Sequence, residues 1–110
     1  MNKNEQQIYL LGDIVVAAQV KIQQDFRHID PIVGISHHMR KAGFPIDAMT
    51  IDCLASGKRI LILINDDKPD CVSYQFGYKD RDPAMEFTEL AFKEINEKTV
   101  YDWIKEYFSK

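Results

Sequence analysis

Residues 48–78 read AMTIDCLASGKRILILINDDKPDCVSYQFGY, and this stretch decides the fold. It holds two apolar runs and one aromatic run, separated by residues that favour turns. The first and third runs alternate apolar with polar residues, which is typical of half-buried strands. The middle run is apolar at every position, so both of its faces are expected to be covered at least in part. The sequence therefore predicts a three-stranded antiparallel sheet with strands at Ala48–Leu54, Arg59–Asn65 and Cys71–Tyr78, the second one central.

Helices are predicted on the N-terminal side of this sheet. Apolar residues recur at steps of three and four along the first segment, which indicates a helix from about Gln6 to Arg27. Asp30 and Pro31 then combine a helix N-cap with a proline suited to the first helical turn. Gly43 follows as a helix-ending signal. This pattern predicts a second helix from Pro31 to about Ala42, and hence an N-terminal helical pair.

The segment after the sheet is less regular. Asp82 and Pro83 repeat the cap-and-proline signal, and helical spacing follows; the alternative is a fourth strand through Phe87–Phe92. Thr99 and Asp102 resemble a capping box at the start of a C-terminal helix with a broad aromatic face. Residues 1–110 are thus predicted to form a single α+β domain. Its antiparallel meander of three or four strands packs with an N-terminal helical pair and a C-terminal helix or helices.

Charge and composition exclude several classes of protein. The net charge is −3, with 5 Lys/Arg against 6 Asp/Glu in residues 1–55 and 9 against 11 in residues 56–110. Such a balance lacks the basic surface that binding to a nucleic acid backbone needs. No apolar run approaches the roughly 18 residues of a membrane span. We therefore expect neither a nucleic acid nor a membrane as a partner, and a cytoplasmic location.

The two cysteines, Cys53 and Cys71, do not form a disulfide framework. They lie on the first and third predicted strands, about 9–10 Å apart across the central strand. That separation is too long for a disulfide bond. We expect both to be reduced and buried as small apolar side chains, in agreement with a cytoplasmic location.

A metal site is the first candidate for chemistry. His28, Asp30 and His37 are residue types that bind metals, and they are the candidate ligands. The spacing is unfavourable, because His37 and His38 are adjacent and would diverge by about 100° on a helix. The favoured interpretation is therefore a solvated helix face with Asp30 as its cap.

A second acidic group follows the middle strand. Carboxylates at a strand end can bind Mg²⁺ or Ca²⁺, but too few ligands follow at regular spacing for a calcium loop. We interpret this group, which consists of Asp66, Asp67 and Asp70, as a solvated turn.

The aromatic residues provide a different candidate site. Tyr74, Tyr78 and Trp103 are candidate contacts for a small apolar ligand between sheet and helix, although core packing is the more common role of such residues. The apolar stripes of the predicted helices also exceed the area of a three-stranded sheet. Surplus apolar surface on a small chain is commonly buried in a dimer.

These observations favour a non-enzymatic protein-interaction module that forms a homodimer, with a second protein as a further partner. No catalytic residue is assigned and no cofactor is expected, because no complete catalytic set is visible. The alternatives are a small metal-dependent hydrolase and a binder of a small apolar ligand.

Overall fold

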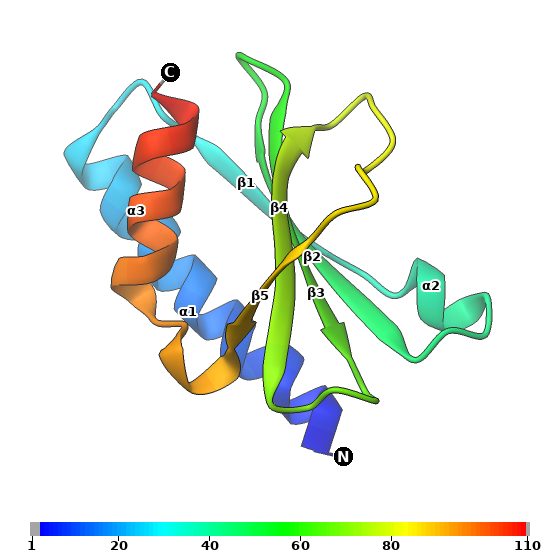
Figure 1. The fold of residues 1–110 in the computed structure, drawn as a ribbon. Coiled ribbons are helices and arrows are strands. Elements are labelled where there is room, and N and C mark those ends of the chain that lie inside the picture. The colour runs from blue at the N-terminus through cyan, green and yellow to red at the C-terminus, as the bar shows by residue number, and fades with distance from the viewer. Residues whose placement is uncertain (1–2, 110) are drawn as a thin grey trace.

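A five-stranded antiparallel sheet forms the centre of the computed structural model, which describes residues 3–109 and the side chains from residue 7 onward. Strand order follows chain order, so the sheet is a meander with β3 in the middle (Figure 1). The strands are β1 (Pro31–Ser36), β2 (Ile46–Cys53), β3 (Lys58–Asn65), β4 (Cys71–Tyr78) and β5 (Thr88–Ala91). The three predicted strands and the central place of the second are confirmed, but the sheet has five strands where three or four were expected.

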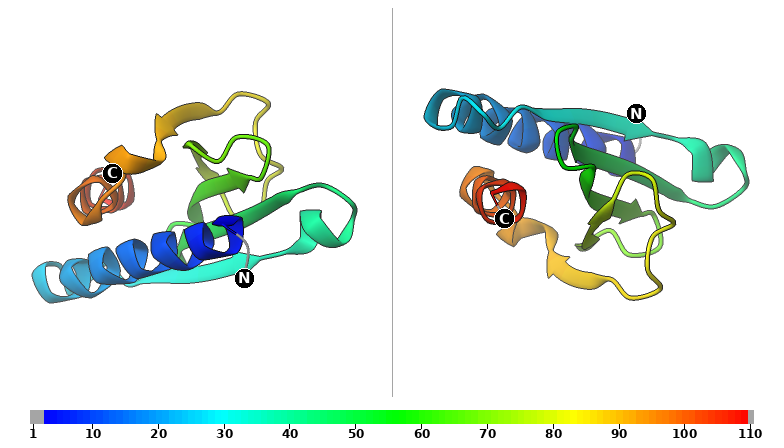
Figure 2. Two further views of the ribbon diagram at one scale, coloured as in Figure 1. Left: turned by 90° about the horizontal axis from the view of Figure 1, so that it is seen from below. Right: turned by 90° about the horizontal axis from the view of Figure 1, so that it is seen from above.

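Two helices cover one face of the sheet, α1 (Lys3–Asp25) and α3 (Glu97–Phe108), and they lie side by side (Figure 2). The stripe of α1 predicted from the sequence is buried, including Leu11, Val15 and Ile22. On β3 the three isoleucines point to this side and are also buried. One continuous core therefore lies between the helix layer and the sheet.

The helix predicted from Pro31 to Ala42 is wrong. This segment forms β1 and, after it, the single turn α2 (His38–Lys41). Ile32, Val33 and Ile35 are β-branched, and such side chains favour a pleated strand over a helix. Pro31 fits as well, because the first residue of an edge strand need not donate a ladder hydrogen bond. The chain therefore begins with one helix instead of a helical pair.

The segment after β4 also differs from the main prediction. Residues 79–87 form a loop that contains Asp82 and Pro83, and β5 then pairs with β4. The alternative of a fourth strand near Phe87–Phe92 is the correct one, followed by the short 3₁₀ turn η1 (Phe92–Glu94). The C-terminal helix begins earlier than expected: Asn96 is its N-cap, and Asn96 Oδ1 accepts a hydrogen bond from the Thr99 N–H at 2.9 Å.

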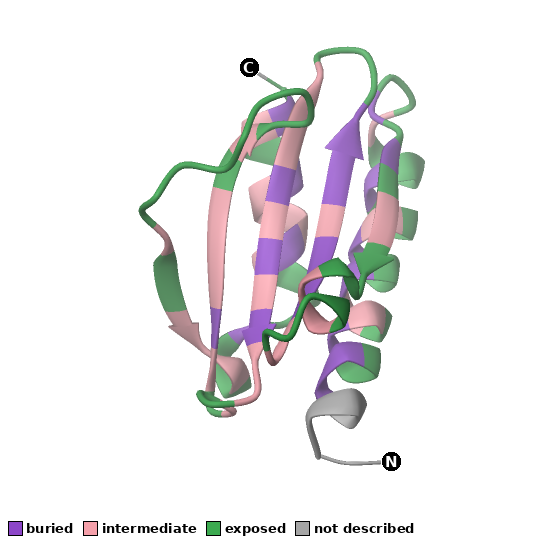
Figure 3. Cartoon of the chain, turned by 90° about the vertical axis from the view of Figure 1, so that its right-hand side faces the viewer, coloured by how far each residue is buried: buried purple, intermediate pink, exposed green. Residues whose placement is uncertain are grey.

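The other face of the sheet, here called the outer face, is not covered by α1 or α3 (Figure 3). It carries Leu61 and Leu63 of β3, which are half-buried, in the alternate positions to the buried isoleucines. The loop 79–87 and the turn α2 border this face. Among residues 3–109, no helix combines the length and the apolar character that crossing a membrane requires.

Candidate functional site

Two of the predicted metal ligands, Asp30 and His37, lie far apart. Asp30 precedes β1 and His37 follows it, so a six-residue strand separates them by roughly 20 Å. Asp30 Oδ1 accepts a hydrogen bond from the Gln23 side chain at 2.8 Å, and His28 meets the Phe26 ring edge-on. Within the described residues, no three His, Cys, Asp or Glu side chains are grouped so that they could hold a metal ion.

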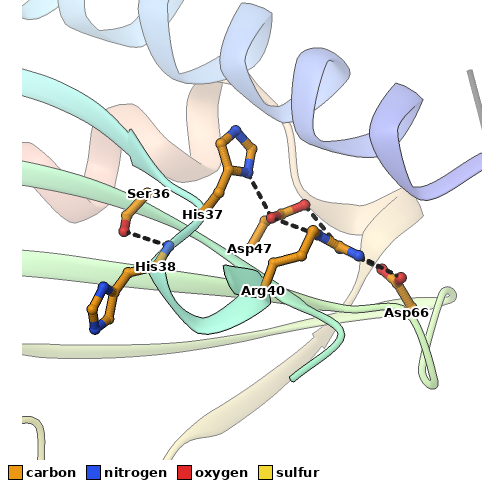
Figure 4. A network of polar contacts seen from close by, with 6 residues as sticks. All are labelled: Ser36, His37, His38, Arg40, Asp47 and Asp66. Carbon is orange, nitrogen blue, oxygen red and sulfur yellow. Dashed lines mark hydrogen bonds and ion pairs between the residues drawn. The ribbon is translucent and has the colours of Figure 1, made fainter. Parts of the chain in front are cut away.

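His37 instead belongs to a polar network around the start of β2 (Figure 4). His37 Nδ1 lies 2.7 Å from Asp47 Oδ1. Arg40 of α2 donates from Nε and Nη2 to the two Asp47 oxygens, each at 3.0 Å. The same guanidinium donates to both Asp66 oxygens at 3.0 and 2.9 Å. One arginine thus binds two carboxylates in a bidentate manner and ties α2 to two neighbouring strand ends.

Asp47 is the buried member of this network, with 2% of its surface exposed. Burial by itself would raise the pKa of this carboxyl, but the hydrogen bonds from Arg40 and His37 outweigh it and lower the pKa. The pKa of Arg40 is raised by its hydrogen bonds to Asp66 and Asp47. Both groups therefore remain charged at neutral pH, and the network acts as a fixed ionic link.

The network does not form a nucleophilic catalytic set. The half-exposed His37 ring is oriented by Asp47, as in many acid–base sites. The neighbouring hydroxyl of Ser36 accepts a hydrogen bond from the His38 N–H at 3.2 Å and lies away from the His37 ring (Figure 4). No local sequence pattern indicates the pairing of Arg40 with Asp47, because a bent segment between two strands brings them together.

Tyr74 and Tyr78 are at alternate positions of β4, opposite Ile62 and Lys58 of β3, so they share one side of the strand. Tyr74 stacks on Trp103 with ring centres 4.3 Å apart, so this pair joins β4 to α3. Tyr78, at the end of β4, has the Arg81 guanidinium 4.6 Å from its ring centre and is among the residues around a cleft that opens on the outer face. Tyr74 and Trp103 are thus part of the packing between helix and sheet, and a ligand role for them stays a prediction.

Both cysteines are free thiols, but they differ in burial. Cys53 is buried as expected, at the end of β2. Cys71 is partly exposed at the start of β4, with its Sγ 3.6 Å from Glu89 Oε2. Burial raises the pKa of the Cys71 thiol and the nearby Glu89 carboxylate adds to this, which disfavours the thiolate form. In the acidic turn, Asp67 and Asp70 are exposed as expected, whereas Asp66 is half-buried and is bound by Arg40.

An apolar surface lies where α1 runs beside the edge strand β1. It consists of Tyr9, Val16 and Val20 of α1 with Val33 and Ile35 of β1, and is here called the β1–α1 surface. Tyr9 is 57% exposed, Val16 and Val20 are each 46% exposed, and Ile35 is 45% exposed. A groove of about 700 Å³ runs between the helix and the strand within this surface.

The fold and its surfaces define an α+β protein built on a five-stranded antiparallel meander with two helices on one face. No protein-family model matches the chain, and comparisons with curated proteins and with solved structures find no significant match.

Proposed function

We propose that this protein is a non-enzymatic interaction module that works as a homodimer, joined along the β1–α1 surface. The observation that carries the proposal is the unprotected edge of β1. An edge strand presents unpaired backbone N–H and C=O groups, and natural proteins usually shield them with charged residues, proline or short strands. β1 has six residues, Pro31–Ser36, with proline at its first position and no charged side chain.

The opposite edge of the sheet shows the usual protection. β5 is four residues long and carries Glu89, which forms an ion pair with Lys68 at 3.0 Å. The two edge strands therefore differ in how far they are protected against pairing with another strand. This contrast supports a partner strand at β1 and solvent at β5.

A two-fold axis through Gly34 gives a consistent geometry for the dimer. Antiparallel pairing about this axis sets Val33 of one copy opposite Ile35 of the other, twice. It also brings Asp30 of one copy towards the α2 turn of the other, which carries the exposed His38. Because the axis is perpendicular to the sheet, both copies of α1 stay on the same face, and their exposed apolar residues approach each other.

The oligomeric state tests this proposal directly. We expect light scattering to give twice the chain mass of 12.8 kDa over a wide range of protein concentration. Ile35→Lys places a charge in the interface and should yield a monomer. Leu54→Lys is the matched control, because Leu54 is 65% exposed at the β2–β3 hairpin and is not part of the β1–α1 surface. A wild-type protein that remains a monomer at high concentration would contradict the proposal.

A further inference from the structure

The outer face holds a second feature that self-association at β1 does not use. A cleft of about 650 Å³ lies over the middle of the sheet, within the range of roughly 300–1,000 Å³ that small-molecule sites occupy. Its floor is formed by Thr50, Leu61 and Leu63, and its far wall by Phe87 in the loop 79–87. The floor is therefore largely apolar, and the rigid sheet supports it.

The wall of this cleft is held in place by one side chain. Gln75 of β4 points to the outer face, and its Nε2 donates to the carbonyls of Ala84 and Glu86, each at 3.0 Å. In return, the Ala84 N–H donates to Gln75 Oε1 at 3.0 Å. Three hydrogen bonds from one amide thus fix the loop 79–87 against the sheet. A cleft with a fixed wall needs little reorganisation when a ligand enters.

One end of the cleft carries the positive charge. Arg59 and Arg81 both line it, and Gly77, opposite Arg59 in the ladder, leaves the space between strand and loop open. The guanidinium of Arg59 is bound by Asp52 at 2.6 and 3.0 Å, so its charge is largely balanced. Arg81 lies over the Tyr78 ring, and within the described residues no carboxylate pairs with it, although Asp82 also lines the cleft.

We infer that the outer-face cleft binds a small amphipathic molecule, with its apolar body over Leu61 and Leu63 and a negatively charged group at Arg81. The size of the cleft, its apolar floor and the unpaired guanidinium at one end each support this class of ligand. An entirely apolar molecule would leave the Arg81 guanidinium without a partner. A highly charged molecule would place charged groups over Leu61 and Leu63, which offer no polar partner. The inference is independent of the dimer, because the cleft lies on the outer face instead of the β1–α1 surface.

Two fluorescent probes with the same ring skeleton test this inference. The anionic probe is 8-anilinonaphthalene-1-sulfonate, and the neutral probe is N-phenyl-1-naphthylamine, which lacks the sulfonate. We expect saturable binding of both to the folded protein at one site per chain, with the anion binding more tightly. Arg81→Ala should weaken the anionic probe about tenfold, the usual effect of losing a charge-assisted hydrogen bond, and leave the neutral probe unchanged.

Matched variants locate the probes. Leu63→Thr removes apolar surface from the floor but introduces a β-branched residue, which suits a strand, and it should weaken both probes several-fold. Phe87→Ala should do so without altering the sheet. Arg27→Ala, which removes an exposed arginine from the turn between α1 and β1, should change neither. Absence of saturable binding would overturn the inference. The inference would also be overturned if the anionic probe bound Arg81→Ala as tightly as it binds the wild-type protein. Binding that neither Leu63→Thr nor Phe87→Ala weakens would overturn it as well.

Discussion

At the scale of single residues, Asp47 shows how a buried charge is tolerated. Its carboxylate is almost completely removed from water, which is costly unless partners replace the lost hydration. Arg40 supplies two hydrogen bonds and His37 a third, so both oxygens are satisfied. Because Arg40 also holds Asp66, the network joins α2, β2 and the turn after β3. Its role is to set the position of the segment that leaves β1.

Replacement of Asp47 by alanine should therefore be destabilising. Breaking a buried ion pair costs about 3–5 kcal/mol, and we expect about 2–3 kcal/mol here because Arg40 is partly exposed and keeps Asp66. Urea unfolding at neutral pH measures this loss. Asp67→Ala is the control, since Asp67 is exposed in the next turn and its removal should change the free energy of unfolding by less than about 0.5 kcal/mol.

The same pair of proteins gives a check on the charge of Asp47. Because the pKa of Asp47 is lowered in the folded state, its contribution to stability is complete above about pH 4 and is lost as the pH falls through the folded value. Followed downward from about pH 5, the difference between wild type and Asp47→Ala should therefore shrink as the solution becomes more acidic. A difference that grows over this acidic range would show that Asp47 is not held as an anion.

At the scale of elements, the sequence predicts what local periodicity determines. The long helix α1 and the three strands β2, β3 and β4 follow from regular apolar patterns. β1 was missed because Asp-Pro also occurs before strands, and three β-branched residues outweigh a capping signal. The loop 79–87 was mistaken for a helix start because its position depends on Gln75, a contact no local pattern reports. The polar network and the outer-face cleft, which several elements build together, were unpredictable for the same reason.

Gln75 gives a prediction at this scale. Gln75→Ala removes three hydrogen bonds to the backbone of the loop 79–87, so the loop should open more often. Trypsin cleavage after Lys79 and Arg81, measured by mass spectrometry on the native protein, should become roughly tenfold faster, which corresponds to about 1.4 kcal/mol. Gln24→Ala, an exposed position on α1, is the control. Equal cleavage rates in wild type and Gln75→Ala would show that these bonds do not hold the loop.

At the scale of the whole molecule, the two faces and the two edges of the sheet differ in what covers them. α1 and α3 bury one face of the sheet and form the core with it. The outer face stays open and carries the cleft (Figure 3). The two edges differ, because β5 has a charged residue and β1 has none. In the proposed dimer, pairing at β1 joins two five-stranded sheets into one continuous sheet and leaves both clefts accessible.

Amide hydrogen exchange of β1, measured at low and high protein concentration, tests the dimer most directly. In the proposed dimer, the amides of β1 that point away from β2 are paired with the second copy. We predict that their exchange slows as the protein concentration rises, while the amides of β5 at the other edge exchange at one constant rate. Fast exchange of the outward amides of β1 at every concentration would contradict the account.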